Sequence, residues 1–166
     1  MINFKDFLKE IKDKKLFFRI YGKDKKISSM AQYRSKNLGN HEYIKILFDD
    51  KSFLIVSIKE KLLMYSDRII GHIKNIKKQD IGEKELIIYQ GKKYKLINKK
   101  DHQQVKELLF GDFSELEEEV FFSDYEAEDD SGELLSLGWL VKNNQRADMH
   151  VKELKIKDIN LVSSLV

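Results

Sequence analysis

Apolar residues recur along this chain with two different periods, and the first period is helical. Phe4, Phe7, Leu8 and Ile11 stand at i, i+3, i+4 and i+7, with charged residues between them. This spacing puts four large side chains on one stripe of a 3.6-residue helix. The pattern predicts an amphipathic N-terminal helix over residues 1–14.

From Leu16 onward the apolar period is two, which is typical of strands with one buried face. The runs are short, rich in Ile, Leu, Phe and Tyr, and separated by Gly, Asp, Asn, Lys and Ser. They predict strands at 16–21, 27–33, 42–48, 53–58, 62–65, 85–89, 93–97, 119–125, 134–141, 146–151 and 155–162.

One later segment returns to helical spacing. Val105, Leu108 and Leu109 lie three and four residues apart, and Gly111 stands where a helix commonly ends. We therefore expect one short helix near 101–109.

Together these elements predict a mainly β fold of the α+β class. The expected architecture is an antiparallel β-barrel or bent sandwich of about ten strands, with the N-terminal helix laid over an open end or edge. No linker divides the chain, so residues 1–166 are expected to form a single domain with its helix at 1–14 and a β-rich body at 15–166.

A short motif occurs twice. Ile20-Tyr21-Gly22-Lys23 is echoed by Ile88-Tyr89-Gln90-Gly91-Lys92. Glycine supplies the positive φ that tight turns need, so we interpret both copies as hairpin turns and not as an internal repeat.

Composition narrows the class of protein. The chain has no cysteine, which excludes a disulfide framework, a thiolate metal site and a cysteine nucleophile. No signal peptide is visible and no uncharged run reaches the roughly 20 residues of a membrane span. We expect a cytoplasmic protein without membrane insertion.

Charge is divided unequally along the chain. Residues 1–100 carry 25 Lys/Arg and 12 Asp/Glu, a balance of +13, whereas residues 101–166 carry 6 and 16, a balance of −10. Such asymmetry is found in nucleic-acid-binding proteins, and also where two parts of one fold or two subunits attract each other. The lysines are scattered over many predicted strands, which favours the second interpretation.

Three blocks of sequence resemble a known family. They are Glu42-Tyr43-Ile44-Lys45-Ile46-Leu47 with Phe53-Leu54-Ile55-Val56, then Leu86-Ile87-Ile88-Tyr89-Gln90-Gly91-Lys92-Lys93-Tyr94-Lys95-Leu96, then Glu119-Val120-Phe121-Phe122-Ser123-Asp124-Tyr125-Glu126 with Leu134-Leu135-Ser136. From about Ile27 to Ser136 the chain resembles the bacterial family called domain of unknown function 4178. The resemblance implies a β-rich fold of unassigned activity and no catalytic residues.

Arg146, Asp148 and His150 form the best local arrangement for catalysis. Alternate residues of a strand share one face, which would align a guanidinium, a carboxylate and an imidazole. An imidazole oriented by a carboxylate serves as a general base or as a metal ligand. The alternative is a solvated polar face with cross-strand ion pairs, and we favour it.

An acidic stretch from Glu115 to Glu133 contains ten Asp/Glu and no Lys/Arg. Within it, Asp124, Glu126 and the carboxylates at 128–130 are of the type that binds calcium. Their spacing does not fit the EF-hand loop, so we interpret the stretch as a solvated loop. No metal or cofactor is predicted.

Two further sets of residues are candidates for binding. Lys92 and Lys93 with the aromatics Tyr89 and Tyr94 are of the type that contacts single-stranded nucleic acid. Lysine far outnumbers arginine, however, and arginine is preferred for base and phosphate recognition. Trp139 is either an interface anchor or a half-buried strand aromatic.

The leading functional hypothesis is a non-catalytic binding or assembly module that acts through contacts with a protein partner or with further copies of itself. The opposed charges and the lack of a catalytic cluster motivate it. The first alternative is a nucleic-acid-binding barrel that uses the basic half, and the second is a small-ligand-binding or enzymatic barrel.

Overall fold

The computed structural model describes residues 9, 13, 17–35, 42–67, 69–71, 73–111 and 119–162. Strands make up most of this part of the chain, together with two short 3-10 helices. The elements are β1 (Phe17–Ile20), β2 (Lys23–Lys25), β3 (Ile27–Ser35), β4 (Glu42–Phe48), β5 (Phe53–Ser57), β6 (Leu62–Ser66), β7 (Ile69–Gly71), η1 (Lys78–Asp80), β8 (Leu86–Tyr89), β9 (Lys92–Phe110), β10 (Glu119–Ala127), β11 (Glu133–Leu140), β12 (Asp148–Glu153), η2 (Ile156–Asp158) and β13 (Ile159–Val162).

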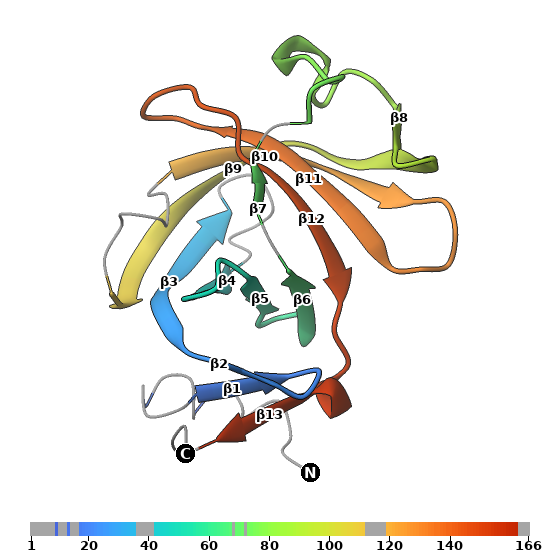
Figure 1. Cartoon of the computed structure of the whole chain (residues 1–166). Coiled ribbons are helices and arrows are strands. Elements are labelled where there is room, and N and C mark those ends of the chain that lie inside the picture. The colour runs from blue at the N-terminus through green and yellow to red at the C-terminus, as the bar shows by residue number, and fades with distance from the viewer. Residues whose placement is uncertain are drawn as a thin grey trace.

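Eight strands close into one antiparallel barrel (Figure 1). The order around the barrel is β3-β4-β5-β6-β12-β11-β10-β9, and the ring closes because β9 pairs with both β10 and β3. The first residues of β9 also pair with β8, which lies outside the ring, and β7 pairs with β12. Closure removes the open edges that would otherwise expose unpaired backbone groups. The predicted β-barrel is thus confirmed.

The barrel consists of two four-stranded meanders, β3–β6 and β9–β12, joined along the β3–β9 and β6–β12 seams. A hairpin leads into each meander, β1–β2 into the first and β8–β9 into the second. The turn residues have nearly the same φ values, 48° and 75° at Tyr21 and Gly22 against 49° and 76° at Gln90 and Gly91. Positive φ at both positions is characteristic of the type I′ hairpin turn, so the echoed motif marks two hairpin turns as expected.

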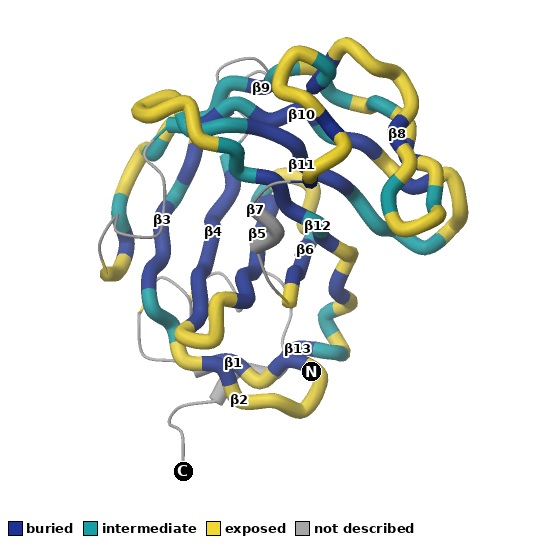
Figure 2. The backbone as a smooth tube through the Cα atoms, turned by 45° about the horizontal axis from the view of Figure 1, so that its top comes forward, coloured by how far each residue is buried: buried dark blue, intermediate teal, exposed yellow. Residues whose placement is uncertain are grey.

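The outer face of the first meander is covered by the three-stranded sheet β13-β1-β2. Phe18 and Ile20 of β1, together with Ile159 of β13, pack against Ile44 and Ile46 of β4. As a result β4 is buried on both faces along nearly its whole length, as Figure 2 shows.

The second meander has a comparable cover on its outer face. Ile81 and Ile87, from the segment between β7 and β9, pack against Tyr125 of β10 and Leu135 of β11. The Tyr125 hydroxyl donates to the Lys84 carbonyl oxygen at 2.8 Å and accepts from the Gly82 N–H at 3.0 Å. Two outer cores therefore flank the barrel on opposite sides (Figure 1).

The short helix predicted near 101–109 is wrong, because these residues belong to β9. The pairing of β9 with β3 has two register shifts, which place Val105 and Leu108 in the same inner cluster although they are three residues apart. Leu109 packs in the outer cluster instead. Bulges interrupt the period of two, and the resulting apolar spacing imitated a helix.

The α+β class is corrected as well. The elements of the described residues include no α-helix, so the fold is mainly β. The helix predicted over residues 1–14 is not seen, and apart from Lys9 and Asp13 that segment lies outside the described residues. Within the described part of the chain, no helix is long and apolar enough to cross a membrane.

Candidate functional site

The barrel encloses a cavity of about 380 Å³, lined by inward-facing side chains of both meanders. Its wall on β9, β10 and β11 carries most of the polar side chains beside Ile97, Val120, Phe122 and Leu134, whereas its wall on β5, β6 and β12 is mainly apolar. The polar wall carries Asn98, Asp101, Gln103, Asp124 and Ser136, and the apolar wall carries Ile55, Leu62, Met64, Met149 and Val151.

Asp124 occupies the middle of the polar wall. It lies between Asn98 on β9 and Ser136 on β11, its partners across the two neighbouring strands. The Ser136 hydroxyl donates to one carboxyl oxygen, and the Asn98 amide donates to the other at 3.3 Å. Asp124 is half-buried and lines the cavity, and the two hydrogen bonds fix the orientation of its carboxyl group.

Asp101 is the second carboxylate of this wall and is only 4% exposed. The Ser35 hydroxyl donates to its Oδ1 at 2.5 Å and the Gln103 amide donates to its Oδ2 at 3.0 Å. The Tyr43 hydroxyl in turn donates to Gln103 Oε1. This network links β3, β4 and β9 through polar groups inside the barrel, where an unsatisfied polar group would be costly.

A backbone irregularity brings Asn98 and Asp101 to the same wall. In a regular strand, residues three positions apart point to opposite faces. The register between β9 and β10 shifts here, since Asp124 pairs with Asn98 and Phe122 pairs with Asp101. Lys100 has φ of 47° and its N–H donates to the Ser123 hydroxyl at 2.8 Å. The bulge re-aims both polar side chains into the cavity.

Lys45 of β4 lies deeper in the cavity and is 5% exposed. Its ammonium is 3.7 Å from Met149 Sδ and 5.1 Å from the centroid of the Phe53 ring. A cation over an aromatic face is attracted by the ring quadrupole. Below it, Leu47 and Phe53 belong to the apolar cluster that fills this end of the barrel.

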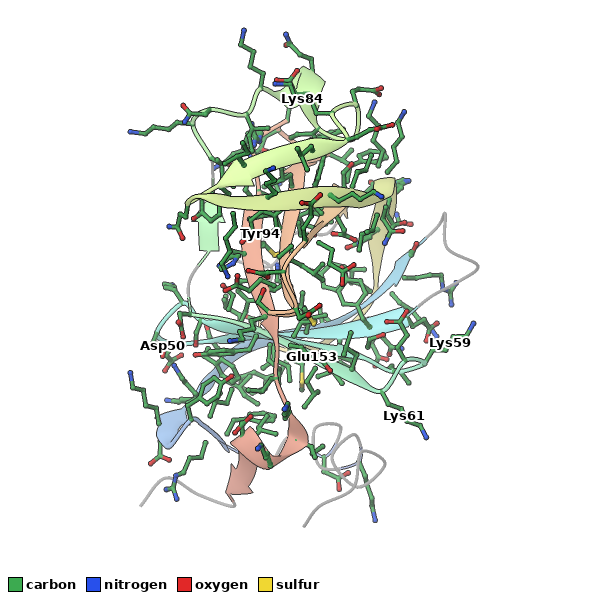
Figure 3. All side chains as sticks on the ribbon, turned by 90° about the vertical axis from the view of Figure 1, so that its right-hand side faces the viewer. Asp50, Lys59, Lys61, Lys84, Tyr94 and Glu153 are labelled. Carbon is green, nitrogen blue, oxygen red and sulfur yellow. The ribbon has the colours of Figure 1, made fainter. Side chains whose placement is uncertain are left out.

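Three glutamates, Glu60, Glu126 and Glu153, line the outer part of the cavity. Glu153 lies near Gly132 of the β10–β11 turn, with 3.7 Å between Glu153 Cβ and the position of a Cβ added at Gly132. Figure 3 shows Lys59 and Lys61 of the β5–β6 turn pointing away from the barrel into solvent. The entrance is therefore acidic although the whole chain has a net charge of +3.

Burial raises the pKa of the Asp124 carboxyl above its ordinary value of 3.8, and the charge of Asp101 acts in the same direction. The hydrogen bonds from Ser136 and Asn98 oppose this shift. The unfolded chain loses the Asp124 proton near pH 3.8, whereas the folded chain keeps it to a higher pH. Ionisation of Asp124 therefore lowers the free energy of unfolding as the pH rises between the two values.

Asp124→Asn is expected to raise the free energy of unfolding by about 1 kcal/mol at pH 7, because it removes a charge that the folded state holds unfavourably. The gain should shrink as the pH falls toward 3.8 and vanish about one unit below it, where the wild-type carboxyl is protonated in both states. Urea unfolding between pH 3.5 and 8 measures it. Glu126→Gln, on the exposed part of the same strand, is the control and should change stability by less than about 0.5 kcal/mol. A destabilised Asp124→Asn at pH 7 would show that the carboxylate stabilises the fold.

The three residues proposed for catalysis lie on the outside of the barrel. Arg146 makes a two-point contact with Asp148, and its Nη1 donates to the Ile76 carbonyl oxygen at 2.6 Å. Asp148 is completely buried and also accepts from the Ile73 N–H at 2.8 Å. These two side chains attach the loop at residues 73–76 to β12, which is a structural role.

His150 belongs to a different group of side chains. Its ring centroid lies 5.8 Å from that of Tyr89 and 6.5 Å from that of Tyr94, and its Nε2 is 4.0 Å from Glu133 Oε1. Tyr94 is buried beneath the β8–β9 hairpin (Figure 3). Residues expected to serve two separate functions, Tyr89 and Tyr94 for binding and His150 for catalysis, are thus in contact.

The lysines of the β8–β9 hairpin have different environments. Lys92 donates to Glu133 and lies 3.2 Å from Asp129, and these two carboxylates raise the pKa of Lys92. Lys93 is exposed. A hollow of about 550 Å³ next to this hairpin is lined by Tyr21, Tyr89 and His150 among others. Tyr21 and Gln90 of the two hairpin turns both line it, and it is about as open to solvent as the cavity inside the barrel.

Trp139 is half-buried on the outer face of β11. Its ring stacks on Phe121 with 5.4 Å between centroids, and Phe121 stacks on His102 at 4.4 Å. The Lys78 ammonium lies 4.8 Å from the centroid of the Trp139 ring. The contacts of Trp139 agree with a half-buried strand aromatic.

The cavity residues were missed by sequence reasoning except for Asp124 and Glu126, which were interpreted as parts of a solvated loop. Both lie on β10, and among the described residues of the acidic stretch the loop is confined to the turn that follows this strand. Among the described residues, no group of three or more His, Asp or Glu side chains is arranged to hold a metal ion. Asp124 and Glu126 share one face of β10 with Val120 and Phe122, which also line the cavity.

Comparison of the chain with protein-family models, with curated proteins and with solved structures finds no match. The resemblance to domain of unknown function 4178 therefore stays a prediction that rests on the three sequence blocks.

Proposed function

We propose that this protein binds a small organic molecule inside its barrel. The observation that carries the proposal is the 380 Å³ cavity, whose walls hold the buried Asp101 and Lys45 and the half-buried Asp124. An eight-stranded barrel is just wide enough either to be filled by its own side chains or to hold one small ligand. Here the end around Phe53 is filled and the other end is not.

The chemistry of the lining supports a ligand site more than a structural core. Burying Asp101, Asp124 and Lys45 costs free energy that apolar side chains of similar size would not cost. The cavity is also within the range of about 300–1,000 Å³ that is common for small-molecule sites, and it combines apolar walls with a few convergent polar groups. Both properties are expected of a site preorganised for a polar ligand.

A protein-contact function is the second candidate, and it is favoured by the outer strand β8. Leu86 and Ile88 on this strand are 44% and 66% exposed, and the described pairings of β8 are all with β9. An open strand edge with apolar side chains is a place where another chain can add a strand. Such a contact would leave the barrel cavity accessible.

The ligand proposal is testable by NMR of methyl-labelled methionine. Met64 and Met149 line the cavity, whereas Met30 is buried in the outer core under β1. In a titration with tryptamine, tryptophol, indole-3-propionate and N-phenyl-1-naphthylamine, compounds that enter the barrel should shift the Met64 and Met149 methyl signals. The Met30 signal should stay in place.

A blocking variant makes this test specific. Leu134→Trp replaces an aliphatic side chain of the cavity lining by a larger indole ring and should abolish the shifts. Val141→Trp, on an exposed turn, should preserve them. The proposal fails if no compound shifts the two cavity methyls, or if Leu134→Trp binds as the wild type does.

A further inference from the structure

Charged and apolar side chains are unevenly distributed around the cavity, and their arrangement indicates which class of ligand fits it. Among the described residues that line it, five carry carboxyl groups and one carries an ammonium group. Two of the carboxyl groups, Asp101 and Asp124, lie inside the barrel, and the other three are at the entrance. Clefts lined by one sign of charge concentrate ions of the opposite sign, so this entrance favours cations.

The two inner aspartates have acceptor capacity left for a ligand. An ionised carboxylate has about four lone-pair sites on its two oxygens. Asp124 receives the side-chain donors of Ser136 and Asn98, and Asp101 receives those of Ser35 and Gln103. Each carboxylate thus accepts two of these hydrogen bonds and can accept more from a donor placed in the cavity. An ammonium group with N–H bonds is such a donor, and it would also relieve the repulsion between the two carboxylates.

The opposite wall provides a surface for an apolar group. Met64 and Met149, with Ile55 and Leu62 beside them, present thioether and aliphatic side chains to the cavity. Methionine adapts its shape to flat or irregular apolar groups and packs well against aromatic rings. A ligand that reaches both walls therefore needs a cationic end and an apolar body.

Lys45 raises the alternative of an anionic ligand. Its ammonium rests against Met149 Sδ and over the Phe53 ring at the deep end of the cavity. An anion would have to pass Glu60, Glu126 and Glu153 and then share the cavity with Asp101 and Asp124. The arrangement of charges disfavours that route.

We infer that the ligand of the barrel is a small organic cation, an amine with at least one N–H and an apolar body, held by Asp124 and Asp101 and packed against Met64 and Met149. This inference rests on the proposed function and adds the chemical class of the ligand to it.

Three indole compounds of similar size separate charge from shape. Tryptamine is a cation, tryptophol is neutral and indole-3-propionate is an anion at pH 7. Dissociation constants from the methionine methyl titration should be at least about tenfold lower for tryptamine than for tryptophol, as expected for charge-assisted hydrogen bonds. Indole-3-propionate should bind most weakly.

Two variants test which residues cause the preference for tryptamine over tryptophol. Asp124→Asn should bring the tryptamine constant to within about threefold of that of tryptophol, and unfolding cannot explain the loss if the variant proves as stable as the wild type. Lys45→Met should leave tryptamine binding unchanged or strengthen it, because it removes a like charge.

The outcomes distinguish the two proposals. If the three compounds enter the barrel with equal affinity, or if indole-3-propionate binds best and loses its binding in Lys45→Met, the cationic class is wrong while the ligand-binding function stands. If neither these three compounds nor N-phenyl-1-naphthylamine shifts the Met64 and Met149 signals, the proposed function itself is wrong.

Discussion

Replacing Gly138 by alanine should lower the free energy of unfolding by about 3 kcal/mol, because the barrel wall leaves no space for a methyl group at this position. A Cβ built on Gly138 would lie 1.8 Å from the Phe121 carbonyl oxygen and 2.6 Å from Phe122 Cδ1. The first of these atoms is backbone on the paired strand β10, so β10 and β11 would have to separate. In a closed barrel such a displacement passes on to the neighbouring pairs of strands.

Gly91→Ala is the matched control for Gly138→Ala. Gly91 has φ of 76° and a Cβ added there would meet no atom within 4 Å. Its replacement should cost only the conformational penalty of the left-handed region, about 1–2 kcal/mol. Urea unfolding of both variants, at equal m-values, measures the difference. Equal losses in the two variants would mean that strand β10 adjusts without strain.

Replacing Asp148 by alanine should lower the free energy of unfolding by about 3–5 kcal/mol, because it leaves the guanidinium of Arg146, whose side chain is only 11% exposed, without its carboxylate. The change also removes the acceptor of the Ile73 N–H, 2.8 Å from Asp148 Oδ2. Hydrogen exchange at the Ile73 amide should accelerate together with the loss of global stability. Asp148→Asn keeps an acceptor and should lose less.

Comparing Asp148→Ala with a double variant tests whether Arg146 and Asp148 have a structural or a catalytic role. The double variant Arg146→Met with Asp148→Leu removes both charges together and should recover part of the stability that Asp148→Ala loses. A folded Asp148→Ala protein of wild-type stability would contradict the structural role and would reopen the question of a chemical one.

Much of the barrel could be predicted from the alternation of apolar residues. β4 and β5 lie where the sequence places them because their apolar runs are bounded by clear turns, such as Asp49-Asp50-Lys51-Ser52. β9 could not be recognised as one strand, since its bulges at Lys100 and between Val105 and Leu108 destroy the period that identifies a strand.

The cavity was harder to predict than the barrel. On β10, Phe121 and Tyr125 face outward while Phe122 and Asp124 face inward, so apolar residues occupy both faces and the sequence does not show which face is the interior. Asp101 joins the site only through the bulge at Lys100 and through Ser35, 66 positions away in the chain. Such a contact depends on long-range pairing that no local pattern reports.

The charge asymmetry along the chain corresponds in part to a position in the fold. Asp101, Asp124, Glu126 and Glu153 all belong to the acidic part at residues 101–166, and all of them line the cavity. Lysines of the other part pair with this acidic part in places, as Lys92 does with Glu133. The excess of negative charge is therefore directed in part to the inside of the barrel.

The pairing of β1 with β13 has a consequence for biosynthesis. Phe18 is among the first described residues of the chain and Ile159 among the last, yet both belong to the core that covers β4. While the polypeptide leaves the ribosome, the apolar cover of the first meander stays incomplete until β13 has been translated, because β1 and β2 precede the meander and β13 follows it. A polypeptide that ends shortly before Ile159 would therefore expose apolar side chains of this core and would be a target for chaperones and proteases.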